Sequence, residues 1–440
     1  MGARPAIAAA LLLAALPARA AEYAALQGHG GPVRAIALNG DGTALTASFD
    51  YSVGYWRDGA PTWLEGHRAA VNAVIWLGAG RAASGGDDFD VRIWDLATGD
   101  STALPGHEGK VVALALAPDG GLLASASWDG TLGLWPLDGQ GGAGPPRFLD
   151  GHQGAVNDVA FSADGARLFS AAADGTIREW DAATGAELRT VIAHGFGVNT
   201  LELGPGDAWL AYGAVDGGTR VIDPETGAEI GDFTLDRRPI LAMAVPPAGD
   251  MLAVGDGEGY IMVLDTDDWS LARDFRAATR GPVWALAWAA AGDAIAAAGI
   301  SDTAYLWPLD GLSGADAVLG AGERSFLRDP ATMTNGERQF ARKCSVCHTL
   351  TGDGARRAGP TLENLFGRPA GSVPGYSYSP ALRDIGITWT DETIDALFDE
   401  GPDHYVPGTK MPMQRIAGAQ DRADLIEYLR TATDPERSRP

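Results

Sequence analysis

Cysteine is nearly missing from this chain: 440 residues contain two, Cys344 and Cys347, three positions apart. A disulfide-stapled scaffold is therefore excluded, because such folds need several cysteines spread along the sequence. Positive charge is also scarce, since 33 Lys and Arg face 57 Asp and Glu, for a formal net charge of −24. That balance argues against nucleic-acid or anionic-lipid partners, which are held by clustered cations.

Long hydrophobic runs are missing as well. The longest, Ala6–Leu16, has eleven residues, well short of the ~20 that a membrane-spanning helix needs. It follows Arg4 and precedes Ala18-Arg19-Ala20, a pattern typical of a secretory signal peptide with its cleavage site. We therefore expect residues 1–20 to be a signal peptide, the mature chain to lack a transmembrane segment, and the protein to be periplasmic.

Glycine is abundant, with 60 residues, and it accompanies an internal repeat. A Gly-His or Ala-His pair recurs at intervals of 38 to 45 residues, at His29, His67, His107, His152 and His194. Alternating apolar runs and polar turns follow each pair, and the units close near positions 56, 94, 135, 180, 222, 264 and 307. Such alternation predicts antiparallel strands, and seven units of this length predict a ring of seven four-stranded sheets.

Gly-His near the start of a unit and Trp-Asp near its end resemble the WD-repeat family. The resemblance covers residues 21–310 and implies a seven-bladed, all-β propeller. It also implies that Tyr23–Gln27 supplies the outer strand of the last blade, so that the two ends of the ring join. Residues 311–330 are expected to be a linker.

Four units carry a recurring set of one His, one Ser or Thr, one Asp and one Trp. The sets are His29/Thr46/Asp50/Trp56, His67/Ser84/Asp88/Trp94, His107/Ser125/Asp129/Trp135 and His152/Ser170/Asp174/Trp180. Because they recur at nearly constant spacing, we interpret them as structural hydrogen-bond networks and not as catalytic triads. Tyr212, Val254 and Ala297 replace the hydroxyl residue in the last three units, which are assigned from the period alone.

The motif with chemical content lies near the C-terminus. Cys344-Ser345-Val346-Cys347-His348 is a C-x-x-C-H run, which indicates covalent attachment of a c-type haem. Two thiols bond one edge of the macrocycle, and the adjacent histidine then reaches the iron. Two other interpretations use the same residues. A redox cysteine pair would need a βαβ context, and a zinc site would need a fourth ligand, for which only His404 remains.

Residues 331–434 resemble the class I cytochromes c of mitochondria and bacteria, an all-α family. The matching segments are Gly336, Phe340, Cys344, Cys347, His348, Gly359-Pro360, Phe366–Arg368, Pro374–Tyr378, Gly386–Trp389, Pro407–Met411 and Arg422–Leu429. The resemblance implies one covalent haem c whose iron is held by His348 and Met411, with Met413 as the competing ligand.

The resemblance also implies the surroundings of the haem. The Pro360 carbonyl would accept a hydrogen bond from His348, and the propionate partners would be Arg368, Tyr378, Trp389 and Thr409. Trp389 and Tyr376 fit simple core packing equally well. Gly336 and Phe340 would contact Tyr428 between the first and last helices. Leu382 and Leu397 stand where the family commonly has polar residues. This makes the cavity more apolar, which can shift the reduction potential of the haem.

Iron with both axial positions filled suits one-electron exchange better than substrate turnover. We therefore expect a periplasmic electron-transfer protein with redox protein partners, in which the propeller docks a partner or scaffolds an assembly. Two alternatives stay open: an oxidoreductase whose propeller holds a second cofactor or a substrate site and feeds electrons to the haem, and a binding module in which the haem is a redox sensor.

Overall fold

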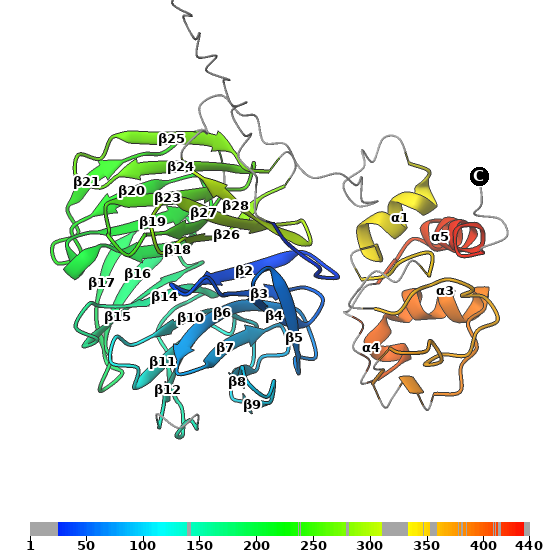
Figure 1. The fold of residues 1–440 in the computed structure, drawn as a ribbon. Coiled ribbons are helices and arrows are strands. Elements are labelled where there is room, and N and C mark those ends of the chain that lie inside the picture. The colour runs from blue at the N-terminus through cyan, green and yellow to red at the C-terminus, as the bar shows by residue number, and fades with distance from the viewer. Residues whose placement is uncertain are drawn as a thin grey trace, which may run out of the picture.

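The computed structural model describes residues 25–138, 142–235, 237, 239–278, 281–309, 333–345, 347–352, 359–376, 378–379, 382–383, 385–407, 409, 411 and 415–434. The signal peptide expected at residues 1–20 and the linker expected at 311–330 lie outside these ranges. The described chain forms a ring of β-sheets followed by a smaller helical part (Figure 1).

Seven four-stranded antiparallel sheets make up the ring. In chain order they are β2 (Val33–Leu38), β3 (Ala44–Ser48), β4 (Ser52–Arg57) and β5 (Ala60–Glu65); β6 (Val71–Gly78), β7 (Arg81–Gly86), β8 (Val91–Asp95) and β9 (Ser101–Leu104); β10 (Val111–Leu116), β11 (Leu122–Ser127), β12 (Leu132–Pro136) and β13 (Arg147–Leu149); β14 (Val156–Phe161), β15 (Arg167–Ala172), β16 (Thr176–Asp181) and β17 (Glu187–Ala193); β18 (Val198–Leu203), β19 (Leu210–Ala214), β20 (Thr219–Ile222) and β21 (Glu229–Asp232); β22 (Ile240–Ala244), β23 (Met251–Asp256), β24 (Tyr260–Asp265) and β25 (Leu271–Arg276); and β26 (Val283–Trp288), β27 (Ala294–Gly299) and β28 (Thr303–Pro308) with β1 (Ala25–Gln27).

The ring closes through its first and last strands. β1 pairs antiparallel with β28, with Leu26 opposite Ala304 and Gln27 opposite Thr303. This pairing confirms the predicted junction of the two ends for residues 25–27. Closure in a propeller leaves only short, protected strand edges.

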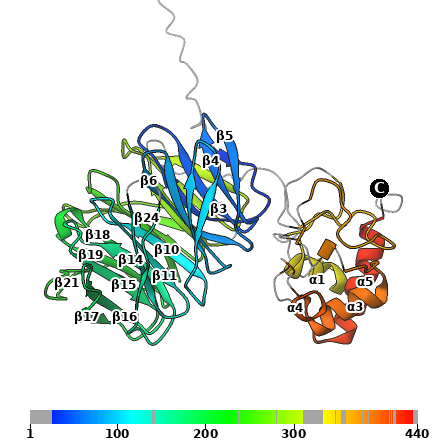
Figure 2. The ribbon, with the colours of Figure 1, turned by 90° about the horizontal axis from the view of Figure 1, so that it is seen from below.

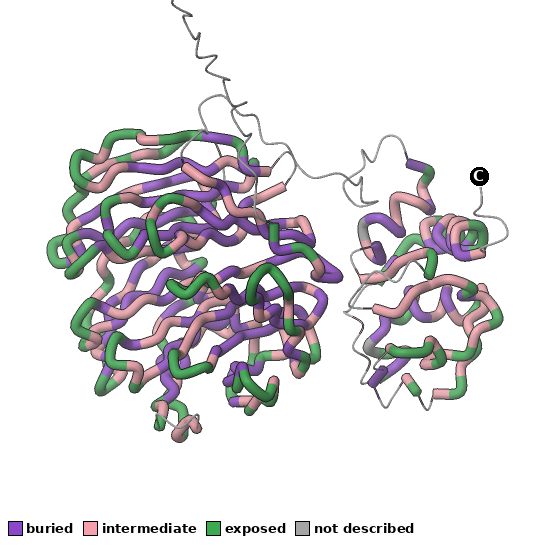
Figure 3. The backbone as a smooth tube through the Cα atoms, viewed as in Figure 1, coloured by how far each residue is buried: buried purple, intermediate pink, exposed green. Residues whose placement is uncertain are grey.

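The core of the ring lies between neighbouring sheets. The second strand of each sheet is buried almost throughout, the other strands mix buried and exposed residues, and the exposed positions gather at the turns (Figure 3). The largest fully buried side chains are the indoles that close five of the units, Trp56, Trp94, Trp135, Trp180 and Trp307. Each large aromatic removes much apolar surface from water, which stabilises the contact between adjacent blades.

The four predicted hydrogen-bond networks are confirmed. In the fourth blade His152 Nδ1 lies 2.9 Å from an Asp174 carboxylate oxygen, and His152 Nε2 lies 2.8 Å from Ser170 Oγ. Trp180 Nε1 donates to the same hydroxyl at 2.8 Å. The same arrangement recurs in the first three blades at His29, His67 and His107. Each network satisfies buried polar groups that would otherwise be costly.

The fifth blade retains half of this network. His194 Nε2 lies 3.1 Å from Asp216, while the Tyr212 hydroxyl lies 3.3 Å from His194 Nδ1 in place of a serine. The sequence placed this blade by its period alone, with Tyr212 in place of the hydroxyl residue, and the structure shows that it still keeps the pairing of His and Asp.

Four helices are described in the C-terminal part: α1 (Asn335–Lys343), α3 (Asp391–Glu400), α4 (Pro402–Tyr405) and α5 (Ala419–Ala432). The Thr334 side chain caps the N-terminus of α1, and Thr390 forms a capping box with Thr393 at the start of α3. None of the helices in the described ranges combines the length and hydropathy needed to cross a membrane.

The first and last of these helices cross at a glycine, as predicted. A Cβ added at Gly336 would lie 2.0 Å from the Asp424 carbonyl oxygen of α5, so only glycine allows this approach. Beside the crossing, the rings of Phe340 and Tyr428 pack with their centroids 5.7 Å apart. The crossing fixes where the chain that follows α1 begins.

Candidate functional site

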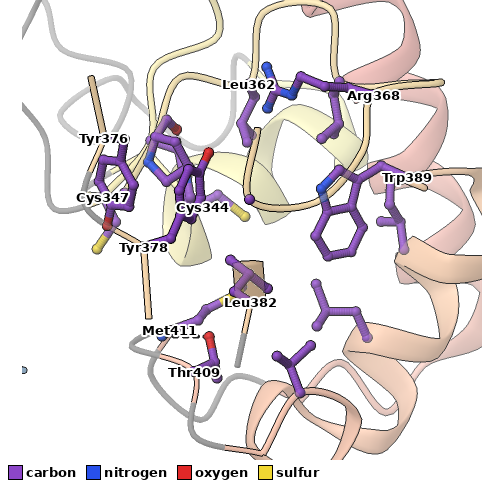
Figure 4. Close-up of a pocket in the computed structure, with 18 of the residues that line it drawn as sticks. Cys344, Cys347, Leu362, Arg368, Tyr376, Tyr378, Leu382, Trp389, Thr409 and Met411 are labelled. Carbon is purple, nitrogen blue, oxygen red and sulfur yellow. Dashed lines mark hydrogen bonds between the residues drawn. The ribbon is translucent and has the colours of Figure 1, made fainter. Parts of the chain in front are cut away.

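One cavity in the helical part is lined by all nine predicted haem-site residues. They are Cys344, Cys347, His348, Pro360, Arg368, Tyr378, Trp389, Thr409 and Met411. Figure 4 shows the two cysteines and Tyr378 on one side, Trp389 on the other, and Met411 with Thr409 below. The structure thus brings together segments from residues 344 to 411 that the sequence placed in a single site.

The turn that ends α1 positions the attachment motif. The Cys344 N–H donates to the Phe340 carbonyl at 2.8 Å, and the His348 N–H donates to the Cys344 carbonyl at 2.8 Å. This tight fold of the chain places both thiols and the imidazole at the same cavity wall. Burial, together with the neighbouring Cys347, raises the pKa of the Cys344 thiol to about 12, so before haem attachment this sulfur is a neutral thiol.

The imidazole of His348 is oriented by a carbonyl. His348 Nδ1 lies 2.8 Å from the Pro360 oxygen, and a bond to the carbonyl leaves Nε2 as the nitrogen with a free lone pair. Gly359 allows this approach, because a Cβ there would lie 2.3 Å from the His348 ring. Burial outweighs the Pro360 hydrogen bond and lowers the pKa of His348, which favours the neutral, ligating form.

Met411 approaches the cavity from the segment after α4. The Thr409 hydroxyl accepts a hydrogen bond from the Met411 N–H at 3.2 Å, and the Thr409 N–H donates to Val406 at 3.0 Å. These bonds hold the backbone that carries the Met411 thioether. The competing ligand Met413 lies outside the described residues.

The predicted propionate partners are fixed through the backbone. Arg368 donates to the carbonyls of Glu363 at 2.5 Å and of Thr361 at 2.8 Å, while the Trp389 N–H donates to the Arg368 carbonyl at 3.0 Å. Arg368 thereby connects the chain at residues 361–363 with Trp389, which precedes α3. Direct contacts of these side chains with haem propionates stay predictions.

Most of the remaining lining is apolar and was not singled out from the sequence. It includes Leu362, Leu365, Ile394, Phe398, Val406 and Leu429, which belong to the core of the helical part. Leu382 and Leu397, the two departures from the family pattern, line the cavity too. One lining residue comes from the ring of sheets: Tyr51, in the turn between β3 and β4.

The residues present fit a covalently bound haem. Two thiols and one carbonyl-oriented imidazole share a cavity with a methionine, which is the donor set of a c-type centre with an axial Met. The apolar lining suits the faces of a macrocycle, and Arg368 adds a cation to the cavity wall that would pair with haem carboxylates.

Comparisons with known proteins agree with this division of the chain. Residues 333–433 match the cytochrome c family, and residues 21–57, 61–95, 100–136 and 144–181 match the WD domain, G-beta repeat. The chain is 43% identical over 105 residues to a cytochrome c of Sesamum indicum, covering 24% of this chain and 93% of that protein. It is 45% identical over 101 residues to a cytochrome c of Gibberella zeae, covering 23% and 94%.

Among solved structures, the WD40 beta propeller domain of Doa1 superimposes with a TM-score of 0.58. The two share 21% sequence identity, and the match covers 65% of this chain and 96% of that one. This likeness shows the fold of the N-terminal part alone.

Proposed function

Since the chain belongs to the cytochrome c family through residues 333–433, we propose that it carries single electrons on one haem c whose iron is held by His348 and Met411. Family membership implies electron transfer through a covalent haem c and, with it, redox partners. Three further points are part of the proposal: the ligand pair, the role of the propeller and the cellular compartment.

The observation that carries the proposal is the shared cavity of Cys344, Cys347, His348 and Met411, with His348 Nδ1 at 2.8 Å from the Pro360 carbonyl. A bound haem supplies the change between ferrous and ferric iron. The chain supplies the rest. His348 presents one nitrogen in a fixed orientation, and Met411 presents a soft sulfur that favours the reduced iron. The apolar lining keeps water away, so that the protein sets the potential.

The propeller is proposed as a surface for docking a redox partner. An exposed aromatic side chain supports this, Trp128 in the β11–β12 turn, with 51% of its surface exposed. The Lys110 ammonium lies 5.2 Å from the centre of the Trp128 ring. Aromatic and cationic groups of this kind are frequent at protein interfaces. A periplasmic location fits the signal-like N-terminus read from the sequence.

Replacing each candidate methionine separately tests the ligand pair. We expect Met411→Ala to abolish the oxidised-state absorption band that arises from sulfur bonded to iron and to lower the midpoint potential, because the axial thioether is lost. Met413→Ala is the matched control and should retain both. Denatured samples of all three proteins should contain the same amount of thioether-bound haem.

Two outcomes would contradict the proposal in different ways. A band that survives in Met411→Ala and vanishes in Met413→Ala would move the ligand by two residues. A purified protein without covalently bound haem would remove the electron-transfer function itself.

A further inference from the structure

The cavity takes one wall residue from outside the helical part. Tyr51 belongs to the first blade, whereas every other lining residue among those that the structure describes lies between Cys344 and Leu429. In two perpendicular views the first blade, β2 to β5, is on the side of the ring that faces the helices (Figures 1 and 2). The cavity is therefore completed by a segment almost 300 residues away in the sequence.

The turn that carries Tyr51 is held in place by the first hydrogen-bond network. The Asp50 carboxylate accepts from His29 Nδ1 at 3.1 Å, from the Gly30 N–H at 2.7 Å and from the Ser52 N–H at 3.0 Å. The Tyr51 N–H donates to the Ser48 carbonyl at 3.2 Å. A phenol displayed on so constrained a turn has a defined position, unlike one on a loose loop.

The backbone at Tyr51 is unusual for its residue type. Its φ is +72°, in the left-handed region that favours glycine. In blades three to six the position after the network's Asp or its equivalent is indeed glycine, with φ between 81° and 94°, at Gly130, Gly175, Gly217 and Gly259. Only Phe89 of the second blade, with φ of +70°, shares the strain among these equivalent positions. Tyr51 therefore keeps its aromatic ring at a cost in backbone strain.

Tyr51 shares the cavity wall with two other tyrosines, Tyr376 and Tyr378. Tyr376 and Tyr378 pack edge to face with ring centroids 4.7 Å apart, and Figure 4 shows Tyr376 beside Cys347. Tyr51 lines the same cavity and lies near Cys347 and Tyr376. Burial raises the pKa of the Tyr51 phenol above its ordinary value, so the ring enters this aromatic wall as a neutral group.

We propose that Tyr51 is a haem-site residue, and that the propeller closes the part of the haem cavity beside Cys347. The inference rests on the proposed haem and adds a second task for the ring of sheets. By covering the cavity, the first blade limits the access of water and of small reductants. Exclusion of water disfavours the more highly charged oxidised centre and thereby raises the potential.

A pair of glycine substitutions in the full-length holoprotein tests this. Tyr51→Gly removes the cover and relieves the strained backbone, so the propeller should stay at least as stable. We expect its midpoint potential to fall and its reduction by ascorbate to become several-fold faster. Phe89→Gly is the matched control, because it relieves the same strain in the next blade without lining the cavity, and it should behave as the unmodified protein. Tyr51→Phe keeps the ring and should be close to unmodified.

The readouts separate failure of the inference from failure of the proposed function. Haem content is measured first on all variants, and a protein without haem c overturns both. If haem is present but Tyr51→Gly matches the unmodified protein in potential and in rate, the cavity is complete without the propeller and the inference is wrong. Equal changes in Tyr51→Gly and Phe89→Gly would also overturn it, because the effect would then come from the turn and not from the cover.

Discussion

The apolar character of the cavity depends on individual side chains. Leu382 and Leu397 both line it, at positions where the family resemblance leads one to expect an amide and a phenol. Leu397 is buried on α3, and Leu382 packs against the same core. A cavity that has lost two polar groups stabilises a charged iron less well, which shifts the balance toward the reduced form.

Restoring an amide at residue 382 should lower the midpoint potential. We expect Leu382→Asn to shift it downward by tens of millivolts, since ~59 mV corresponds to 1.4 kcal/mol for a one-electron couple and a partly paired amide contributes about that much or less. Spectroelectrochemical titration of the holoprotein measures the shift. Leu382→Met, which keeps the site apolar, is the control and should move the potential little. An unchanged potential in the asparagine variant would mean that residue 382 does not face the iron.

Single residues also show how much of the cavity could be predicted from the sequence. The nine predicted site residues line one cavity. They could be named from the sequence because the C-x-x-C-H motif and the segments that resemble cytochromes c give their positions along the chain. Tyr51 was missed because its place at the cavity depends on how the ring of sheets and the helical part meet, and no local sequence pattern encodes that arrangement. The available signal was its position in the repeat, where four other blades have glycine.

Among the elements, the crossing of α1 with α5 depends on specific residues in both helices. Asn335 Nδ2 donates to the carboxylates of Asp421 at 2.8 Å and Asp424 at 2.6 Å, and Gly336 lies against the α5 backbone. Since α1 leads directly into Cys344, a shift of this helix moves the attachment motif as well.

A methyl group at the crossing should therefore destabilise the helical part. Alanine favours helix over glycine by about 1 kcal/mol, but a Cβ at 2.0 Å from the Asp424 oxygen forces the helices apart, and we expect a net loss of about 1–3 kcal/mol from Gly336→Ala. Denaturant unfolding followed by haem absorbance measures this transition. Gln339→Ala in the same helix is the control and should cost little. A variant as stable as the unmodified protein would show that α1 can move without consequence.

The ring of sheets shows which features of a blade the sequence repeat predicts. The first four blades were predicted with their networks because hydroxyl, Asp and Trp keep a constant spacing, and the structure confirms them. Blades five to seven were predicted from the period alone, and the topology confirms all seven. The His194–Asp216 pair of blade five went unrecognised because Tyr212 fills the place of the usual small hydroxyl residue.

At the scale of the whole molecule, two acidic side chains lie close together on the first strands of neighbouring blades, Asp158 on β14 and Glu202 on β18. Asp158 of β14 accepts from the Thr200 hydroxyl at 2.9 Å and from the Leu201 N–H at 3.0 Å, yet burial outweighs these bonds and raises its pKa to about 6. Burial and the nearby Asp158 raise the pKa of Glu202 to about 8. Arg34 of β2 supplies a cation to this region, and its Nη1 donates to the Trp284 carbonyl at 3.1 Å.

Glu202 should therefore make the stability of the ring depend on pH. Between its ordinary pKa of 4.5 and its folded value of about 8, the folded protein holds a proton that the unfolded chain releases, so stability falls as pH rises through this window. Glu202→Gln removes the titration. We expect its Tm to match that of the unmodified protein at pH 4 and to exceed it at pH 9 by about 2 °C or more, on a scale of about 2–4 °C per kcal/mol. Thermal unfolding followed by tryptophan fluorescence reports on the ring, whose blades bury most of the indoles.

Glu108→Gln is the control for this prediction. It replaces an exposed glutamate beside His107, changes the net charge equally and should give the same Tm difference at both pH values. If Glu202→Gln also gives a difference independent of pH, the carboxyl ionises normally and the ring tolerates a charge at its centre.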